Sequence, residues 1–220
     1  LSCFSQNLLI KYRYSDIIKA WKGGEKVGQE KEKSLQARTG NSKNPYPNAC
    51  RAHRRNLASD YRKTYELYMT FPENENGYMN SVYGYNYEQF LEWIEKKRNW
   101  SLGKELPEGF VPDTTYVLVD EDVYVGVFSL RHCLNDFLRE GPGHIGYCIS
   151  EKYRGRGYAT KGLKLTLEKA GQRSIHEVYM SVNKDNPASL RVQMKNGAYI
   201  HHENETKFFT RINLMEIDEC

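Results

Sequence analysis

One stretch of the sequence constrains the fold more than any other. Between residues 143 and 172, a short apolar run, a loop with two glycines and a long amphipathic segment follow one another, and the loop carries Arg154, Gly155, Arg156 and Gly157. Glycine lets backbone amides approach a ligand closely. The first turn of a helix adds unpaired N–H groups and the positive end of the helix dipole. The stretch therefore predicts a strand–loop–helix corner that can hold a pyrophosphate.

Other phosphate-binding loops fit this stretch less well. A dinucleotide-binding fingerprint needs a third glycine, but Thr160 stands at that position, and an antiparallel hairpin precedes the strand. A Walker A loop needs Gly-Lys-Ser/Thr, which the sequence lacks here. For the loop alone, an ordinary surface turn stays open as an alternative.

The order of the surrounding elements predicts the fold class. Ser59 is a candidate cap for a helix over 59–71, and Asn86 with Gln89 makes a capping box that opens a second helix. Two β-rich runs at 115–120 and 123–130 then read as a hairpin. A strand at 144–149, a helix at 157–172, a strand at 178–182, a short helix after Asn186 and a C-terminal hairpin complete the series. Antiparallel strands followed by strand–helix–strand order predict an α+β fold.

Charge divides the chain into two parts. Residues 1–56 hold 12 Lys/Arg and 4 Asp/Glu, a net charge of +8, whereas residues 57–220 hold 20 Lys/Arg and 24 Asp/Glu, a net charge of −4. Much of the first part is rich in Lys, Gly, Asn and Ser and has no apolar periodicity. We therefore expect residues 1–56 to be a basic extension, disordered or outside the domain, and residues 57–220 to form the domain.

The hydropathy and the cysteines argue against several classes of protein: membrane-spanning, secreted, disulfide-rich and zinc-binding. No window approaches the ~20 consecutive apolar residues that a membrane helix needs, and the first ten residues lack the basic lead-in and clean apolar run of a signal peptide. An odd number of cysteines without a C-x-x-C pair disfavours a disulfide framework and a zinc site, so we expect no metal and a reducing cytoplasm. These cysteines are Cys3, Cys50, Cys133, Cys148 and Cys220.

Three segments in order resemble the GNAT superfamily of N-acetyltransferases. Residues 143–160 resemble its motif A, with Gln/Arg-x-x-Gly-x-Gly/Ala, and residues 184–189 with 195–198 resemble its motif B. A Leu-Pro-Glu-Gly-Phe-Val-Pro segment at 106–112 and the Leu-Arg-His of 130–132 are similar to a group of predicted bacterial acetyltransferases within GNAT. The resemblance covers about residues 57–220. It implies a mixed, mostly antiparallel central sheet with helices on both faces.

The resemblance also implies acetyl-CoA as the acetyl donor. In the family, the pantetheine arm bonds along the motif A strand, and the loop amides and the first helical turn hold the pyrophosphate. Motif B residues touch the pantetheine or its sulfur. The implied cofactor-binding residues are Ile149, Ser150, Arg154, Gly155, Arg156, Gly157, Tyr158, Ala159, Thr160, Asn186 and Ser189. For Asn186, a plain helix cap is an equal alternative.

The resemblance implies direct attack of a primary amine on the thioester, which needs a base and an acid for the departing thiolate. Many relatives carry a base glutamate where this chain has His144, so His144 is the candidate base, with substrate binding or a core hydrogen bond as alternatives. Gln193 stands where the family's motif B usually has a tyrosine, so either Tyr147 is the acid or the thiolate leaves without a dedicated acid.

These departures keep other functions open. An idle acyl-CoA-binding or regulatory module fits the missing tyrosine, and a nucleic-acid-associated protein fits the basic extension, although we expect no nucleic-acid or membrane partner. Family domains also open with an apolar strand, which residues 49–57 match poorly. Many relatives dimerise, so a homodimer is one expectation, and the sequence does not identify the acceptor amine.

Overall fold

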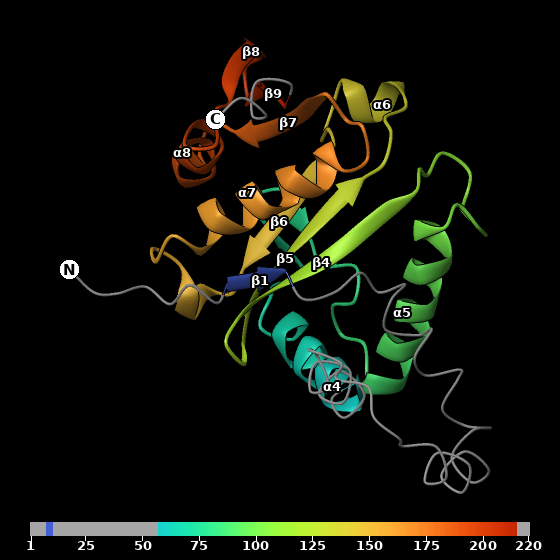
Figure 1. Cartoon of the computed structure of the whole chain (residues 1–220). Coiled ribbons are helices and arrows are strands. Elements are labelled where there is room, and N and C mark those ends of the chain that lie inside the picture. Colours follow the sequence, from blue (N-terminus) through green and yellow to red (C-terminus); the bar gives the residue numbers. More distant parts are fainter. Residues whose placement is uncertain (1–7, 11–56, 215–220) are drawn as a thin grey trace, which may run out of the picture.

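The centre of the protein is an antiparallel sheet. In the computed structural model, which describes residues 8–10 and 57–214, the strand order is β1-β4-β5-β6. The hairpin of β4 (Asp113–Asp120) and β5 (Val123–Arg131) was predicted from two β-rich runs separated by an acidic turn, and β6 (Ile145–Ile149) adds to its β5 edge. Figure 1 shows this sheet running through the middle of the molecule.

Helices cover both faces of the sheet. On one face, α4 (Leu57–Tyr68) and α5 (Tyr87–Ser101) pack their aromatic side chains against Val117, Val127 and Cys148. On the other face, α7 (Tyr158–Gly171) packs Leu163 and Leu167 against a second apolar cluster (Figure 1). Both faces of β4 and β5 are therefore buried, and the predicted α+β fold with helices on both faces is confirmed.

The two N-terminal helix predictions had different outcomes. The capping box of Asn86 and Gln89 is present at the start of α5, because each residue's side chain accepts from the other's backbone N–H. Helix α4, in contrast, begins at Leu57 and ends at Tyr68. Ser59 therefore lies inside the first turn instead of capping it. A two-strand hairpin, β2 (Asn74–Glu75) with β3 (Tyr78–Met79), connects the two helices and was not predicted.

The C-terminal strands form a second sheet. Its order is β7-β9-β8, made of β7 (Glu177–Asn183), β8 (Tyr199–Glu203) and β9 (Lys207–Asn213), with α8 (Pro187–Met194) between β7 and β8. The two sheets meet at a single bridge, where Gly143 pairs with Met180 and the His144 N–H donates to the Tyr179 carbonyl at 2.6 Å. Gly143 has φ +70°, and a Cβ there would collide with the Tyr179 carbonyl. Beyond this contact, β6 and β7 belong to separate sheets.

One described strand falls in the predicted N-terminal extension. β1 (Leu8–Ile10) pairs with the β4 residues from Leu118 to Asp120, at the sheet edge opposite β6 (Figure 1). The remainder of residues 1–56 lies outside the described residues. The boundary at residue 57 therefore stays a prediction for that segment. None of the described helices has the length and the apolar composition of a membrane-spanning segment.

Candidate active site

The predicted corner between β6 and α7 is an open cradle of backbone amides. After β6, a 3₁₀ turn (Glu151–Tyr153) leads to Gly155 at φ +74° and to Gly157 at φ +81°, which caps α7. A Cβ built on either glycine meets no atom within 4 Å, so the space above the loop is free. Among the described residues, the N–H groups from Gly155 to Thr160 have no hydrogen-bond acceptor. Six unpaired donors at a helix N-terminus form a site suited to an anion.

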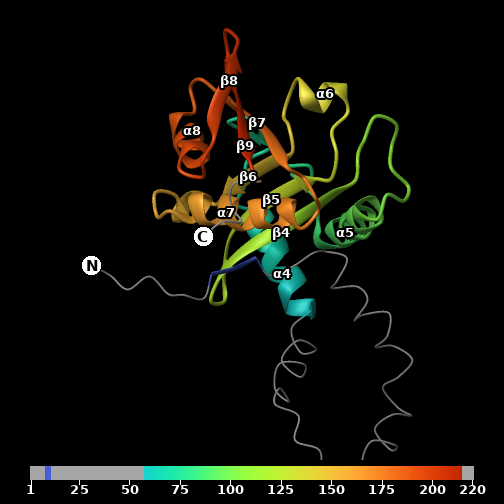
Figure 2. The same cartoon turned by 45° about the horizontal axis from the view of Figure 1, so that its top comes forward.

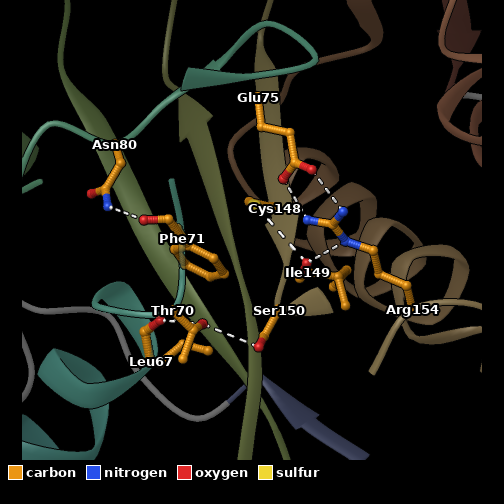
Figure 3. Close-up of polar contacts among 9 residues, drawn as sticks. All are labelled: Leu67, Thr70, Phe71, Glu75, Asn80, Cys148, Ile149, Ser150 and Arg154. Carbon is orange, nitrogen blue, oxygen red and sulfur yellow. Dashed lines mark hydrogen bonds and ion pairs between the residues drawn. The ribbon is translucent and has the colours of Figure 1, made fainter. Parts of the chain in front are cut away.

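The two loop arginines differ in their surroundings. Arg154 donates through both terminal nitrogens to Glu75, at 2.8 and 2.5 Å, and through Nε to the Ile149 carbonyl at 3.0 Å (Figure 3). The ion pair raises the pKa of Arg154 and lowers the pKa of Glu75. Its charge is thus compensated, and it ties the β2–β3 hairpin to the end of β6. Arg156 is exposed and forms no salt bridge within the described part of the chain, so its charge remains free.

The first turn of α7 is fixed by contacts that leave its amides open. The hydroxyl of Tyr158 donates to Asp120 at 2.7 Å, which pins the start of the helix to the end of β4. Ala159 is half-buried beside the apolar cluster under α7. The carbonyl of Thr160 accepts from the Asn196 side chain at 3.2 Å. The backbone N–H groups of these three residues therefore remain without an acceptor among the described residues and belong to the cradle.

β6 pairs with β5 on one side only, so every second residue of β6 directs its backbone N–H and C=O groups to the unpaired edge. The Ser150 N–H donates to the Val125 carbonyl, and the Ser150 carbonyl accepts from Tyr153, so the Ser150 backbone is used inside the fold. Since backbone groups of an antiparallel strand alternate between its two edges, the Ile149 N–H points away from β5. Among the described strands, β6 has no ladder partner on that side. Ile149 is thus the better placed of the two to bind an extended ligand.

Side chains from β6 and α8 meet across the gap between the sheets. The Tyr147 hydroxyl lies 2.7 Å from Ser189 Oγ, and Asn186 caps α8 by accepting from the Ser189 N–H at 3.0 Å. Burial raises the pKa of Tyr147 to about 12, against the opposing hydrogen bonds of Ser189 and Gln193. Gln193 itself is buried and accepts from Thr210 at 2.6 Å. The Tyr147 phenol therefore stays protonated and lies beside Ser189 and Gln193.

His144 lies where the two sheets meet and is 7 % exposed. Its Nδ1 accepts from the Tyr179 N–H at 3.0 Å, so the proton of the neutral ring is on Nε2. Burial, and then Arg131, Arg139 and Arg211, lower the pKa of His144 to about 4, against the opposing charge of Glu177. The ring lines a hollow of about 330 Å³. His144 is therefore neutral near pH 7, and Nε2 is a hydrogen-bond donor.

Several residues near the site had no signal in the sequence. Glu75 pairs with Arg154 across 79 residues, and Tyr179 holds His144 across 35. Arg139 and Arg211 act on the charge at His144 from two other elements. These contacts depend on tertiary packing. The Asn-Gly pair at 76–77 is a turn signal that could have located the hairpin beside Glu75, but not the pairing of Glu75 with Arg154.

Comparisons with known proteins agree with this geometry. The acetyltransferase (GNAT) domain model matches residues 52–199. The search of curated proteins gives no match. Among solved structures, the ribosomal L7/L12 α-N-protein acetyltransferase RimL, in complex with coenzyme A, is 14% identical at a TM-score of 0.54, over 70% of this chain and 89% of that chain. A GNAT-family acetyltransferase from Streptococcus pneumoniae is 13% identical at a TM-score of 0.50, over 71% and 95%.

A third structure is the microcin C7 self-immunity acetyltransferase MccE in complex with acetyl-CoA and AMP. It is 12% identical at a TM-score of 0.50, over 71% of this chain and 86% of that chain. At such identities these likenesses show the fold alone. The match to the family model carries the assignment, because it spans more than half of the sequence. The protein therefore belongs to the acetyltransferase (GNAT) domain family and is an acyltransferase.

Proposed function

We propose that the protein transfers an acetyl group from acetyl-CoA to a primary amine by direct attack of the amine on the thioester. The observation that carries this proposal is the cradle of six unpaired amides beside the unpaired edge of β6. The cradle is suited to a pyrophosphate and the edge to the amides of a pantetheine arm. Structural neighbours in complex with acetyl-CoA or coenzyme A support the same donor for this chain.

The cradle residues divide the binding of acetyl-CoA among them. The amides from Gly155 to Thr160 donate to the pyrophosphate, and Arg156 supplies the free positive charge. Ile149 bonds the pantetheine through its N–H. Arg154 holds the end of β6 in place through its bonds to Glu75 and to the Ile149 carbonyl. No binding role for the Ser150 backbone follows from its contacts, because they lie within the fold.

For His144, the hydrogen bond from Tyr179 favours a donor role over the base role that its residue type suggests. A base would accept a proton at Nε2, which requires Nδ1 to carry the ring proton and to give up the Tyr179 bond. With that bond intact, Nε2–H can donate to the acceptor or to the developing oxyanion. The three arginines near His144 disfavour an ammonium ion there, so the amine binds in its neutral form.

Tyr147 is the proposed acid for the departing thiolate. Its phenol is protonated at neutral pH and lies between β6 and α8, beside Ser189. Asn186 fixes Ser189 by capping α8, so the cap and the ligand role are compatible. Gln193 carries no exchangeable proton of the required acidity, and its side chain already bonds Thr210.

The donor site is tested by two isosteric variants of one glycine. Gly157→Asn and Gly157→Asp both enter open space, and both residue types tolerate a positive φ better than other side chains. Only the aspartate places a negative charge in the cradle. We expect acetyl-CoA to bind Gly157→Asp at least about tenfold more weakly than Gly157→Asn, a difference of about 1.4 kcal/mol. Isothermal titration calorimetry measures both dissociation constants.

The control and the second assay separate the remaining alternatives. Gly171→Asp makes the same change at the far, exposed end of α7 and should leave binding unchanged. Equal affinities of the two Gly157 variants would remove the loop as the pyrophosphate site. Thiol release from acetyl-CoA with a panel of amines then tests turnover. Tight binding without acetyl transfer to any amine would instead identify an idle acyl-CoA-binding module.

A further inference from the structure

A groove runs from His144 to the C-terminal hairpin. The hollow at His144 is also lined by Arg139, Glu177 and Tyr179. A second hollow of about 570 Å³ shares Arg139 and Tyr179 with the first and extends to residues of the β8–β9 hairpin. Figure 2 shows this hairpin and α6 (Asp136–Arg139) at the same end of the molecule, on either side of β7. The two hollows therefore adjoin at Arg139 and Tyr179 and form one groove that reaches His144.

Two arginines of this groove carry charges that nothing in the described structure neutralises. Arg211 is 5 % exposed, and its guanidinium lies 3.6 Å over the ring of Tyr179. Arg139 approaches the same ring at 5.4 Å. Neither forms a salt bridge with a described residue, and the one hydrogen bond seen for Arg211 goes to the Thr210 carbonyl. A guanidinium has five N–H donors, so most of those on Arg211 are left for a ligand.

The acidic residues of the groove do not cancel the positive charge of the arginines at His144. Glu140 and Glu177 line its two parts. The charge at His144 comes from Arg131, Arg139 and Arg211, and Glu177 alone opposes it. His201 and His202 add further donors from the hairpin side. An acceptor with extra positive charges, such as a polyamine, would be repelled from this surface.

We infer that the acceptor is a small primary amine that also carries an oxyanion group, held by Arg139 and Arg211 while its amine lies at His144. The inference rests on the proposed function and names the substrate class of that site. Carboxylate and phosphate share the chemistry, because a guanidinium binds either through paired hydrogen bonds. The two adjoining hollows give such a molecule room to span from the arginines to the histidine.

The test compares pairs of amines that differ in the anionic group. With acetyl-CoA and the full chain, thiol release is measured for ethanolamine against O-phosphoethanolamine, for 1-aminobutane against 4-aminobutanoate, and for spermidine. We expect kcat/KM for at least one anionic amine to exceed that for its neutral partner by about tenfold or more, the gain of one charge-assisted hydrogen bond. The pair that shows the difference identifies phosphate or carboxylate. Spermidine should be the poorest acceptor.

Arginine variants test whether the preference for anionic amines depends on the arginines of the groove. Arg139 is exposed at the end of α6, so Arg139→Gln should fold. It should reduce the preference for the anionic amine over its neutral partner, measured as the ratio of their kcat/KM values, by about tenfold. Arg62→Gln is the matched control: Arg62 is also exposed and lies over a tyrosine ring, Tyr87, on a different element. It should change neither value.

Each outcome decides a separate point. Acetylation of neutral amines or of spermidine at rates equal to or above those of the anionic amines overturns the inference and leaves the proposed function intact. An unchanged preference in Arg139→Gln also overturns it. Calorimetric titration with the same amines separates binding from turnover: anionic amines that bind in an Arg139-dependent way without being acetylated support the groove and contradict the proposed function. No binding and no acetyl transfer for any amine overturns both.

Discussion

Acidification should destabilise the protein through His144, and the size of the effect follows from its position. The folded-state pKa is about 4, against 6.5 for an ordinary histidine, because the ring is buried among arginines. As pH falls below 6.5, the unfolded chain binds the proton first, so stability that is present above this pH is lost toward pH 4. Each pH unit in this window costs about 1.4 kcal/mol. Between pH 7.5 and 5.0, His144 should therefore remove about 2 kcal/mol from the free energy of unfolding.

The variant His144→Asn isolates this contribution. The asparagine Oδ1 can accept the Tyr179 N–H in place of Nδ1, and the amide does not titrate. Burial also lowers the pKa of His132 to about 4, but His132 is present in both proteins and cancels in the comparison. Urea unfolding, followed by tryptophan fluorescence at pH 7.5 and 5.0, gives the four free energies. The loss between these two pH values should be about 2 kcal/mol smaller in the variant than in the wild type.

A second histidine variant serves as the control for His144→Asn. His176→Asn removes an exposed histidine directly before the start of β7, and it should keep the wild-type pH dependence. If wild type and His144→Asn lose equal stability on acidification, His144 is not held neutral by its surroundings. The donor role proposed for Nε2 would then lose its basis as well.

Two further variants test the packing and the proposed acid. Gly162→Val should lower the free energy of unfolding by about 2 kcal/mol or more, because a Cβ at Gly162 collides with the buried ring of Phe128. The control is Gly171→Val, which places the same side chain in open space on the same helix. Equal urea midpoints for the two variants would contradict the packing argument. Tyr147→Phe should lower kcat for thiol release by about 10²-fold without weakening acetyl-CoA binding in calorimetry. Tyr153→Phe should keep the wild-type rate, and an unchanged kcat in Tyr147→Phe would remove the phenol as the acid.

Local patterns predicted those parts of the fold that local contacts stabilise. The capping box of Asn86 and Gln89 closes within four residues, and the turn after Asp120 joins two strands that pair with each other directly. Gly157 has a positive φ at the start of α7, a conformation that glycine adopts without strain but that the loop pattern did not predict. The start of α4 was misplaced, because Ser59 is a good cap by residue type although the helix begins two residues earlier.

In the site, too, the sequence predicted the local loop but not the contacts between distant segments. The open amides between Gly155 and Thr160 follow from a strand–loop–helix corner, which is local in the sequence. The pairing of Arg154 with Glu75 and the bond from Tyr179 to His144 join distant segments. Residue type suggested a charged Arg154 facing the ligand and a basic His144. Because Glu75 pairs with Arg154, Arg154 positions the end of β6. Because the Tyr179 N–H donates to Nδ1 of His144, the Nε2 of His144 is a donor.

The sequence by itself determined the order of elements, the acidic character of the part after residue 56 and the amide cradle, because each depends on spacing and residue type within a few positions. Only the tertiary structure decided which charges remain free. Arg154 is neutralised by a hairpin 79 residues away, whereas Arg139 and Arg211 converge on Tyr179 from α6 and β9 without an acidic partner among the described residues. A net charge is a property of composition, but the field at His144 depends on which arginines the fold brings close to it and which carboxylates it keeps away.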